Sequence, residues 1–272
     1  MGDEVRGGSD GLDVTAPNWA RIANYFLDGK DHFAADRKAA EELLSYAPEI
    51  RTMTVELKEF HGRVVRHLAA EGMTQFLVVG AGLPSSCNTH VAARETQPRA
   101  RVVYVADDPV VLSHGRALVA TDDDTGMVEG DLLDPDAIID DPVTRRLIDP
   151  ALPVVVIIPH RLQFTPDVDE PYKRVGELRD WMPAGSHLVV THAVLDSRPK
   201  TADRVVPVYQ RIFRRTEDAS RTRQQVLRFF DGTELIDPGL VYIRQWRPDH
   251  PLAARNPERI WTVGGVGRKP GP

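Results

Sequence analysis

The spacing of apolar positions changes along the chain, from a helical period near the N-terminus to short apolar runs farther on. Apolar side chains between residues 19 and 71 recur three and four positions apart, which predicts helices at about 19–29, 34–46 and 48–71. Residues 1–15 are small and polar and have no such period, as is typical of a disordered tail. We therefore predict a tail over 1–15 and a helical cap over 16–72.

Short apolar runs alternate with helical segments from residue 73 onward. We expect strands at residues 76–79, 101–105, 127–129, 154–158 and 187–191. The first is an apolar run typical of a buried parallel strand, and the fourth is wholly apolar. The helices expected between them cover residues 86–97, 109–120 and 171–181. This alternation predicts an α/β fold with a doubly wound sheet over residues 73–272.

The last part of the chain has a different order of elements. Helical periods over 201–216 and 221–230 are followed by two strand-like segments at 242–246 and 261–265. With no helix between these two segments, we expect them to form an antiparallel pair at the edge of the sheet. We thus expect one domain over residues 16–272, with 73–272 as its α/β core.

Composition narrows the classes of protein. A length of 272 residues suits one α/β domain with extra helices. The net charge of −6 argues against a general nucleic-acid or membrane-surface binder. We find neither an apolar run of about 18 residues nor a secretion signal, and the single cysteine, Cys87, has no partner for an internal disulfide. We expect a cytoplasmic protein without a metal site and with no membrane or nucleic-acid partner.

A glycine-rich turn follows the first predicted strand. Gly80 and Gly82 flank Ala81, at the end of the sheet where ligands of such folds lie. Glycine at these positions lets the backbone approach a ligand closely. The same pattern also occurs in ordinary strand-to-helix turns, so the motif by itself leaves both interpretations open.

Further sequence blocks resemble those of a known family. The first reads Pro-Asn-Trp-Ala-Arg-Ile at 17–22 and continues through Asp-Gly-Lys-Asp-His-Phe at 28–33. Others lie at 25–27, 34–37, 80–84, 103–105, 108–112, 131–135, 229–232, 238–241, 246–248 and 265–270. By these blocks the chain resembles the S-adenosylmethionine-dependent methyltransferase-like proteins of antibiotic-producing actinomycetes. The resemblance implies a Rossmann-like, seven-stranded methyltransferase fold with an N-terminal helical cap.

The chain departs from the family pattern where the cofactor would bind. Val78 and Ala106 stand where the family has carboxylates, which hold the amino end and the ribose of the cofactor, and Ala81 replaces a usual threonine. Hydrogen bonds to charged groups are worth roughly 1.5–3 kcal/mol each, so two losses weaken binding strongly. These departures imply a degenerate site, and we therefore expect no cofactor.

S-adenosylmethionine binding is the alternative that these departures leave open. Asp131 stands at the position that contacts adenine in the family, and Asp107 or Asp108 can replace the acid that holds the ribose. Under this alternative the cofactor contacts are Gly80, Gly82, Asp107, Asp108 and Asp131.

The densest polar cluster of the helical cap lies in a segment that the family places over the cleft. Asp31 and His32 are candidate general bases there, and Lys30 can hold an anion. Tyr25 and Asp28 are candidate substrate contacts. The competing interpretation of this cluster is helix capping on a solvated surface.

A second group of candidates follows the fourth strand. His160 and Arg161 should emerge at the carboxyl edge of the sheet, where such a pair can bind or protonate an anionic leaving group. Gln163 can hydrogen-bond a substrate, and His192 closes the fifth strand near the same cleft. The competing interpretation is a loop bonded to its own backbone, with a structural histidine at 192.

The degenerate site favours a biosynthetic enzyme of secondary metabolism that no longer methylates. A similar case is the aziridine synthase of azinomycin-type pathways, which closes a ring by amine attack with loss of sulfate and works with a small partner protein. Under this hypothesis Asp31 or His32 takes the proton, and Arg161, His160 and Lys30 stabilise the leaving group. Two alternatives remain: a small-molecule methyltransferase, and a non-catalytic partner subunit. The expected partners are a small biosynthetic intermediate and either a small protein or a second copy of the chain.

Overall fold

The structure is a computed structural model of the 272-residue chain. It describes residues 13–85, 88–194, 196 and 198–271, so most of the predicted tail over 1–15, as well as Cys87, lies outside the described residues. Within the described part of the chain, none of the helices combines the length and the apolar composition that a bilayer crossing requires.

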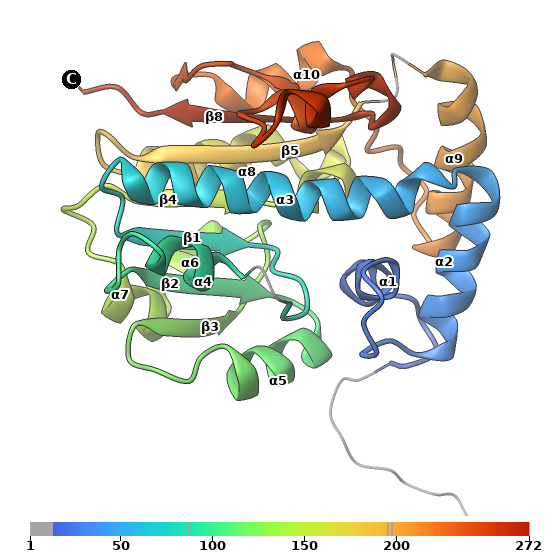
Figure 1. The fold of residues 1–272 in the computed structure, drawn as a ribbon. Helices are drawn as coiled ribbons and strands as arrows, with labels where there is room; N and C mark the ends of the chain where they lie inside the picture. Colours follow the sequence, from blue (N-terminus) through green and yellow to red (C-terminus); the bar gives the residue numbers. More distant parts are fainter. Residues whose placement is uncertain (1–12, 86–87, 195, 197, 272) are drawn as a thin grey trace, which may run out of the picture.

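Helices and strands alternate through most of the chain (Figure 1). The α-helices are α1 (Trp19–Phe26), α2 (Ala34–Tyr46), α3 (Glu49–Ala70), α4 (Thr89–Arg94), α5 (Pro109–Leu118), α6 (Pro135–Asp140), α7 (Pro142–Leu147), α8 (Pro171–Trp181), α9 (Pro199–Ile212) and α10 (Arg223–Leu227). The strands are β1 (Gln75–Val79), β2 (Arg101–Ala106), β3 (Thr125–Glu129), β4 (Val155–Ile158), β5 (His187–Ala193), β6 (Glu234–Leu235), β7 (Val241–Tyr242) and β8 (Thr262–Arg268). The 3-10 helices are η1 (Arg161–Phe164), η2 (Asp167–Asp169), η3 (Arg228–Phe230), η4 (Ile243–Gln245), η5 (Pro251–Ala254) and η6 (Pro257–Arg259).

The strands form one mixed sheet in the order β3-β2-β1-β4-β5-β8-β6, with β7 also paired to β8. Strands β1 to β5 are parallel, and β8 runs antiparallel to β5, β6 and β7. The predicted α/β fold is therefore confirmed. The predicted strand number of seven is wrong, because the described residues form an eight-stranded sheet and include the two-residue strand β7.

The predicted edge pair near the C-terminus is only partly correct. β7 ends at Tyr242 and β8 lies between β5 and β6 rather than at an edge. The chain leaves the sheet after Tyr242 because η4 carries Ile243 and Trp246 into the core. Arg63 of α3 holds this segment, since its guanidinium donates to the carbonyl oxygens of both residues, at 2.7 Å and 3.1 Å. Packing against α3 thus replaces strand pairing there.

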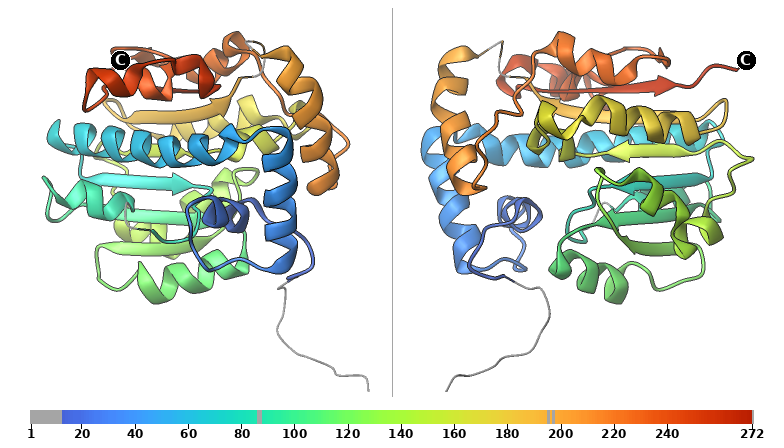
Figure 2. Two further views of the ribbon diagram at one scale, coloured as in Figure 1. Left: turned by 45° about the vertical axis from the view of Figure 1, so that its right-hand side comes forward. Right: turned by 180° about the vertical axis from the view of Figure 1, so that it is seen from behind.

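Each face of the sheet has its own apolar core, because neighbouring residues of a strand point to opposite faces. Val78 and Tyr104 belong to the core under α3, α4 and α5, whereas Leu77 and Val79 belong to the core under α6, α7 and α8. The two views of Figure 2 show helices on both faces. The strands are buried almost throughout, which explains why they appear in the sequence as continuous apolar runs.

The helical cap, which comprises α1, α2 and α3, meets the sheet where the parallel strands end. Figure 1 shows α1 and α2 beyond the arrowheads of β1 and β2, while α3 continues along one face of the sheet. Asn18 caps the N-terminus of α1, because its Oδ1 accepts a hydrogen bond from the backbone N–H of Ala20 at 2.7 Å. The expected helices over 34–46 and 48–71 are confirmed as α2 and α3.

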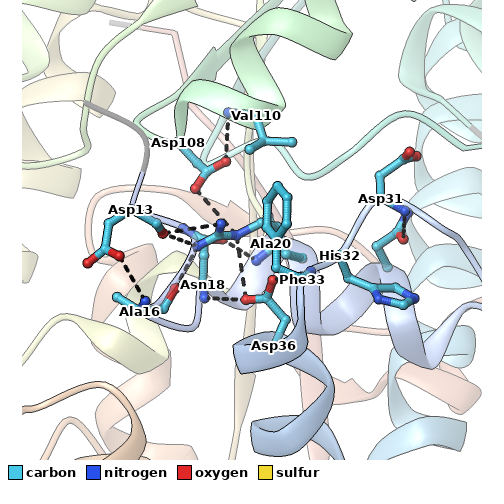
Figure 3. A network of polar contacts seen from close by, with 12 residues as sticks. Asp13, Ala16, Asn18, Ala20, Asp31, His32, Phe33, Asp36, Asp108 and Val110 are labelled. Carbon is cyan, nitrogen blue, oxygen red and sulfur yellow. Dashed lines mark hydrogen bonds and ion pairs between the residues drawn. The ribbon is translucent and has the colours of Figure 1, made fainter. Parts of the chain in front are cut away.

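A buried ion cluster fastens the helical cap to the core of the domain (Figure 3). The Arg21 Nε of α1 lies 3.5 Å from the Asp36 carboxylate of α2 and 3.8 Å from the Asp108 carboxylate, which precedes α5. Asp36 also accepts hydrogen bonds from the backbone N–H groups of Asn18 and Phe33. Because these three charged side chains are at most 7% exposed, each depends on the others for compensation.

Candidate functional site

A cavity of about 400 Å³ lies between the helical cap and the carboxyl ends of β1 and β2. We call it the cleft cavity. The helical cap contributes Asn24 of α1 with Lys58 and His61 of α3 to its wall, and the sheet edge contributes Gly82 and His160. The position agrees with the general rule that ligands of doubly wound sheets bind beyond the carboxyl ends of the strands.

The glycine turn forms the floor of this cavity. Gly80 has a φ of +88°, a conformation that residues with a Cβ rarely adopt. Its N–H donates to the Val105 carbonyl at 3.0 Å and so ties the turn to β2. A Cβ on Gly80 would lie 3.1 Å from the Cβ of Arg161, whereas a Cβ on Gly82 would meet nothing within 4 Å. Gly80 is therefore required by the backbone, and Gly82 faces open space.

Arg161 closes one side of the turn by bridging two carboxylates. Its side chain passes over Gly80, and its Nη1 lies 3.3 Å from an Asp107 oxygen while its Nη2 contacts the Asp131 carboxylate. Partial burial raises the pKa of the Asp107 carboxyl, the Arg161 charge opposes that rise, and the Asp131 carboxylate adds to it. Asp107 follows β2 and Asp131 follows β3, so the two acids converge across neighbouring strand ends.

Val78 and Ala106, where the resemblance leads us to expect carboxylates, have apolar side chains. Val78 lines the cleft cavity, and Ala106 is buried in the core. Asp108 is used elsewhere, because its Oδ1 accepts from the N–H groups of Val110 and Val111 and so caps α5. Asp107 is therefore the better candidate for a ribose contact, because it pairs with Arg161, whose side chain lies against Gly80.

His160 lies beneath Trp19 at the end of the cleft cavity. Its φ is +52°, uncommon for a residue with a side chain, and it is 8% exposed. Neither ring nitrogen makes a well-formed hydrogen bond among the described residues, although the neighbouring Gln163 side chain interacts with the ring and opposes the fall in its pKa. Burial lowers the pKa of the imidazole to about 4, which keeps the ring neutral at pH 7. A buried donor or acceptor without a partner is uncommon in native proteins and calls for a functional explanation.

His61, which the sequence did not single out, lines the same cavity from α3. Its Nε2 is buried and unpartnered among the described residues, and burial lowers its pKa to about 3. The available signal was its helical position one turn after Leu57, on the buried face of α3. That signal is weak, because an apolar helix face accommodates a structural histidine equally well. Lys58 and Asn24 were missed for the same reason.

Gln163 and His192 lie on the far side of His160. The Oε1 of Gln163 is buried without a partner among the described residues. His192 is satisfied, because its Nδ1 lies 2.7 Å from the Ala193 carbonyl and its Nε2 lies 3.3 Å from the Arg221 guanidinium. Burial lowers the pKa of His192 to about 3. Gln163 and His192 therefore line the same pocket as His160, and both ring nitrogens of His192 are already engaged by the protein.

The polar cluster of the helical cap lies apart from the wall of the cleft cavity. Asp28 pairs with Arg51 at 2.8 Å, and the Asp31 carboxylate lies 3.4 Å from His114 Nε2. Lys30 is exposed. The structure therefore groups these residues at the surface of the domain.

Two neighbouring candidates also have contacts within the helical cap. The Nε2 of His32 lies 3.0 Å from the Gly29 carbonyl, and its ring packs edge-on against Tyr25 at 5.2 Å. The Tyr25 hydroxyl lies 3.5 Å from Glu41. From this segment of the chain, Asn24 and Gly29 line the cleft cavity instead.

The whole chain is similar to proteins of one known family. The sequence profile described as S-adenosyl methyltransferase matches residues 6–270. A protein of known structure from Thermobifida fusca, assumed to be a methyltransferase, is 36% identical, with a TM-score of 0.90 over 96% of this chain and 98% of its own. A DUF574 family protein from Streptomyces avermitilis is 34% identical, with a TM-score of 0.89 over 95% and 99%.

More distant similarity shows the fold alone. An O-methyltransferase family protein from Burkholderia thailandensis is 12% identical, with a TM-score of 0.53 over 84% of this chain and 62% of its own. No curated protein matches the chain.

Proposed function

The chain belongs to the S-adenosyl methyltransferase family, and from this premise we propose that it transfers a methyl group from S-adenosylmethionine to a small molecule held in the cleft. S-adenosylmethionine supplies an electrophilic methyl group, which passes to a nucleophile of the acceptor and leaves S-adenosylhomocysteine. The expectation that no cofactor is used finds no support in the family match.

The observation that carries the proposal is the convergence of Asp107 and Asp131 on Arg161, whose side chain lies against the Gly80 turn. Two carboxylates that can bind one guanidinium can instead accept hydrogen bonds from ribose hydroxyls and from an adenine amino group. We assign Asp107 to the ribose and Asp131 to the adenine. Gly82 adds open space beside the turn, so these residues fit the cofactor once Arg161 moves away.

Arg161 is able to move because it lies near the surface. Its side chain is 21% exposed, and its two partners are 51% and 29% exposed. Ion pairs at such exposure are worth about 0–1 kcal/mol, because solvent screens them. Hydrogen bonds from a ligand to the same carboxylates are worth roughly 1.5–3 kcal/mol each, so a ligand can displace the guanidinium.

His160 is our candidate for the residue that takes the acceptor's proton. It lines the cleft cavity, its ring nitrogens lack a well-formed hydrogen bond among the described residues, and the ring is neutral at pH 7, so a nitrogen lone pair is available to accept the acceptor's proton. A base placed within hydrogen-bond reach of the nucleophile typically contributes about 10²–10⁴ in rate. We rank it above Asp31 and His32, which lie outside the cavity wall.

Calorimetric titration with S-adenosylmethionine and S-adenosylhomocysteine tests the proposal. We expect micromolar binding by the wild type, and about ten- to hundredfold weaker binding by Asp131→Asn, which removes one charged acceptor. Asp136→Asn is the matched control, because Asp136 is an exposed acid nearby in α6. Absence of binding up to millimolar concentrations would refute the proposed function.

A second candidate is the cofactor-free synthase suggested by the resemblance. It is favoured by the bridging position of Arg161 and by Val78 and Ala106 in place of acids. In this reaction a substrate amine attacks a neighbouring carbon, the proton passes to a base, and an anion such as sulfate leaves. The small partner protein or homodimer expected from the resemblance belongs to this candidate.

We rank the synthase second on electrostatic grounds. The Arg161 charge is already matched by two carboxylates, and Lys30 is exposed away from the cavity wall. The local charge is therefore poorly suited to a departing anion. Turnover without S-adenosylmethionine, together with absent cofactor binding, would reverse this ranking.

A further inference from the structure

A second, smaller cavity continues from His160 away from the cleft cavity. Its volume is about 80 Å³, and its wall includes the buried Trp261 together with four aromatic residues that are less buried: Trp19, Phe164, Tyr209 and Phe213. We call it the aromatic pocket. The rings of Phe164 and Phe213 have centroids 5.1 Å apart, and Trp19 lies 5.1 Å from Phe164 and 6.0 Å from Tyr209. All four residues are only half-buried, so apolar ring surface remains uncovered.

The aromatic pocket and the cleft cavity share three lining residues, namely Trp19, Thr54 and His160. His160 therefore stands at the junction of the two spaces, with ring nitrogens that lack a well-formed hydrogen bond among the described residues. A molecule whose apolar end lies among the rings would place an adjacent polar group beside this histidine. Its nucleophile would then face the cleft cavity, whose wall includes the Gly80 turn.

The chemistry of the pocket wall limits what can enter. Arg215, Glu217 and Asp218 also line it, but they are exposed and so lie at its mouth. The histidines beside the rings, His160 and His192, are neutral at pH 7. Because the charges of Arg215, Glu217 and Asp218 are solvent-exposed and screened, they would compensate a charged group among the rings only weakly, and burying such a group is costly. The pocket is therefore suited to a neutral apolar group.

The size of the pocket sets a second limit. A cavity of ~150 Å³ lined by apolar side chains holds one benzene molecule. The aromatic pocket has about half that volume, at about 80 Å³. The pocket as it stands is smaller than a benzene-sized cavity, so we take a single ring as the upper limit for the apolar group that it holds.

We propose that the aromatic pocket binds the methyl acceptor, and that this acceptor carries a neutral apolar group no larger than one ring next to a hydroxyl or amine. This inference rests on the proposed function, because it takes the molecule in the pocket to be the acceptor. The nucleophile donates its hydrogen bond to His160, which takes the proton as the methyl group is transferred.

Phenol is a minimal probe for the pocket, and Phe213→Trp is the variant that fills it. Phe213 is half-buried at the end of α9, so the larger ring can be accommodated without disrupting the core. Calorimetry on the full chain should show saturable phenol binding by the wild type and at least tenfold weaker binding by the variant. Leu118→Trp is the matched control, because Leu118 is 63% exposed at the end of α5, and its phenol affinity should equal that of the wild type.

S-adenosylhomocysteine is titrated into the same three proteins to separate the two claims. Equal cofactor affinity with selective loss of phenol binding in Phe213→Trp supports the inference. Normal cofactor binding with no phenol binding by the wild type, or with equal phenol binding by Phe213→Trp, overturns the inference alone. Binding of tetramethylammonium in preference to phenol also overturns it, because the rings would then select a cation. Phenol binding without any cofactor binding overturns the proposed function and, with it, the acceptor assignment.

Discussion

Two groups of polar side chains at the carboxyl ends of the strands differ in how their hydrogen-bonding groups are satisfied. On the side of β2 and β3, Asp107, Asp131 and Arg161 satisfy one another while they remain partly open to solvent. Around the cleft cavity, His160 of the sheet edge and His61 of the helical cap bury ring nitrogens that lack a well-formed hydrogen bond among the described residues. A ligand can replace the ion pairs of the first group, whereas the ring nitrogens of the second group still lack well-formed hydrogen bonds within the described part of the chain.

This difference indicates what each side can do. Exposed ion pairs contribute about 0–1 kcal/mol, so a ligand can replace them at small cost. A buried unpartnered polar group costs about 1–3 kcal/mol, and it persists only where packing enforces it. We therefore assign binding of the cofactor's adenosine to the open side, and proton transfer to the buried side. The following predictions test this division.

The largest effect is expected at the junction residue of the buried side. His160→Asn keeps a residue type that tolerates the left-handed backbone but removes the imidazole. Because it removes the proposed base, we expect kcat to fall about 10²–10⁴-fold while S-adenosylhomocysteine affinity is retained. Single-turnover methyl transfer and calorimetry measure the two quantities. An unchanged kcat would exclude His160 as the base.

A comparable loss, but of stability, is expected from the ion cluster that holds the helical cap. Arg21→Met leaves the buried carboxylates of Asp36 and Asp108 uncompensated, so we expect the free energy of unfolding to fall by about 3–5 kcal/mol. Arg51→Met is the control, since its pair with Asp28 is exposed and should contribute at most about 1 kcal/mol. Urea unfolding measures both. Equal effects of the two variants would contradict a special role for the buried cluster.

Acid should destabilise the buried side next. The pKa of His160 is about 4 and that of His192 about 3 in the fold, against 6.5 for an ordinary histidine. Below pH 6.5 the unfolded chain binds protons that the folded protein excludes. The free energy of unfolding therefore falls by about 1.4 kcal/mol per pH unit and per histidine until the folded pKa is reached, and no loss remains above pH 6.5. Urea unfolding at pH 7 and pH 5 should show the loss, and His192→Asn should reduce it. Equal stability at both pH values would contradict the burial of neutral imidazoles.

The smallest effect is expected on the open side. Arg161→Ala releases Asp107 and Asp131 for the ligand, so S-adenosylmethionine affinity should rise by up to about tenfold. Arg51→Ala serves as the control for general loss of positive charge. Calorimetry gives both constants. Weaker binding by Arg161→Ala would mean that Arg161 contacts the ligand itself, and would place the ion pairs in the binding machinery.

The elements of the fold were accessible from sequence where burial produces a regular pattern. The apolar runs at β1 and β4 and the helical period of α3 were sufficient, because each reflects packing on a whole face. The region around Trp246 was not predictable in this way. Its strand-like composition is overridden by hydrogen bonds from Arg63, a residue more than 180 positions earlier in the chain.

The site was predictable in part for a similar reason. Asp107, Asp131 and His160 follow strands, so topology alone brings them to one edge. His61 and Tyr209 lie on helices, where position in the sequence does not distinguish a cavity wall from ordinary core. The bridging of two acids by Arg161 depends on three side-chain positions at once, which spacing along the chain does not fix.

A crystal structure of the protein with S-adenosylhomocysteine tests the central claim most directly. The account predicts adenosine between Asp107 and Asp131, with the Arg161 guanidinium displaced from both carboxylates and the sulfur atom directed toward His160. An unchanged bridge from Arg161 to both acids at saturating S-adenosylhomocysteine, with no ligand at the Gly80 turn, would contradict it.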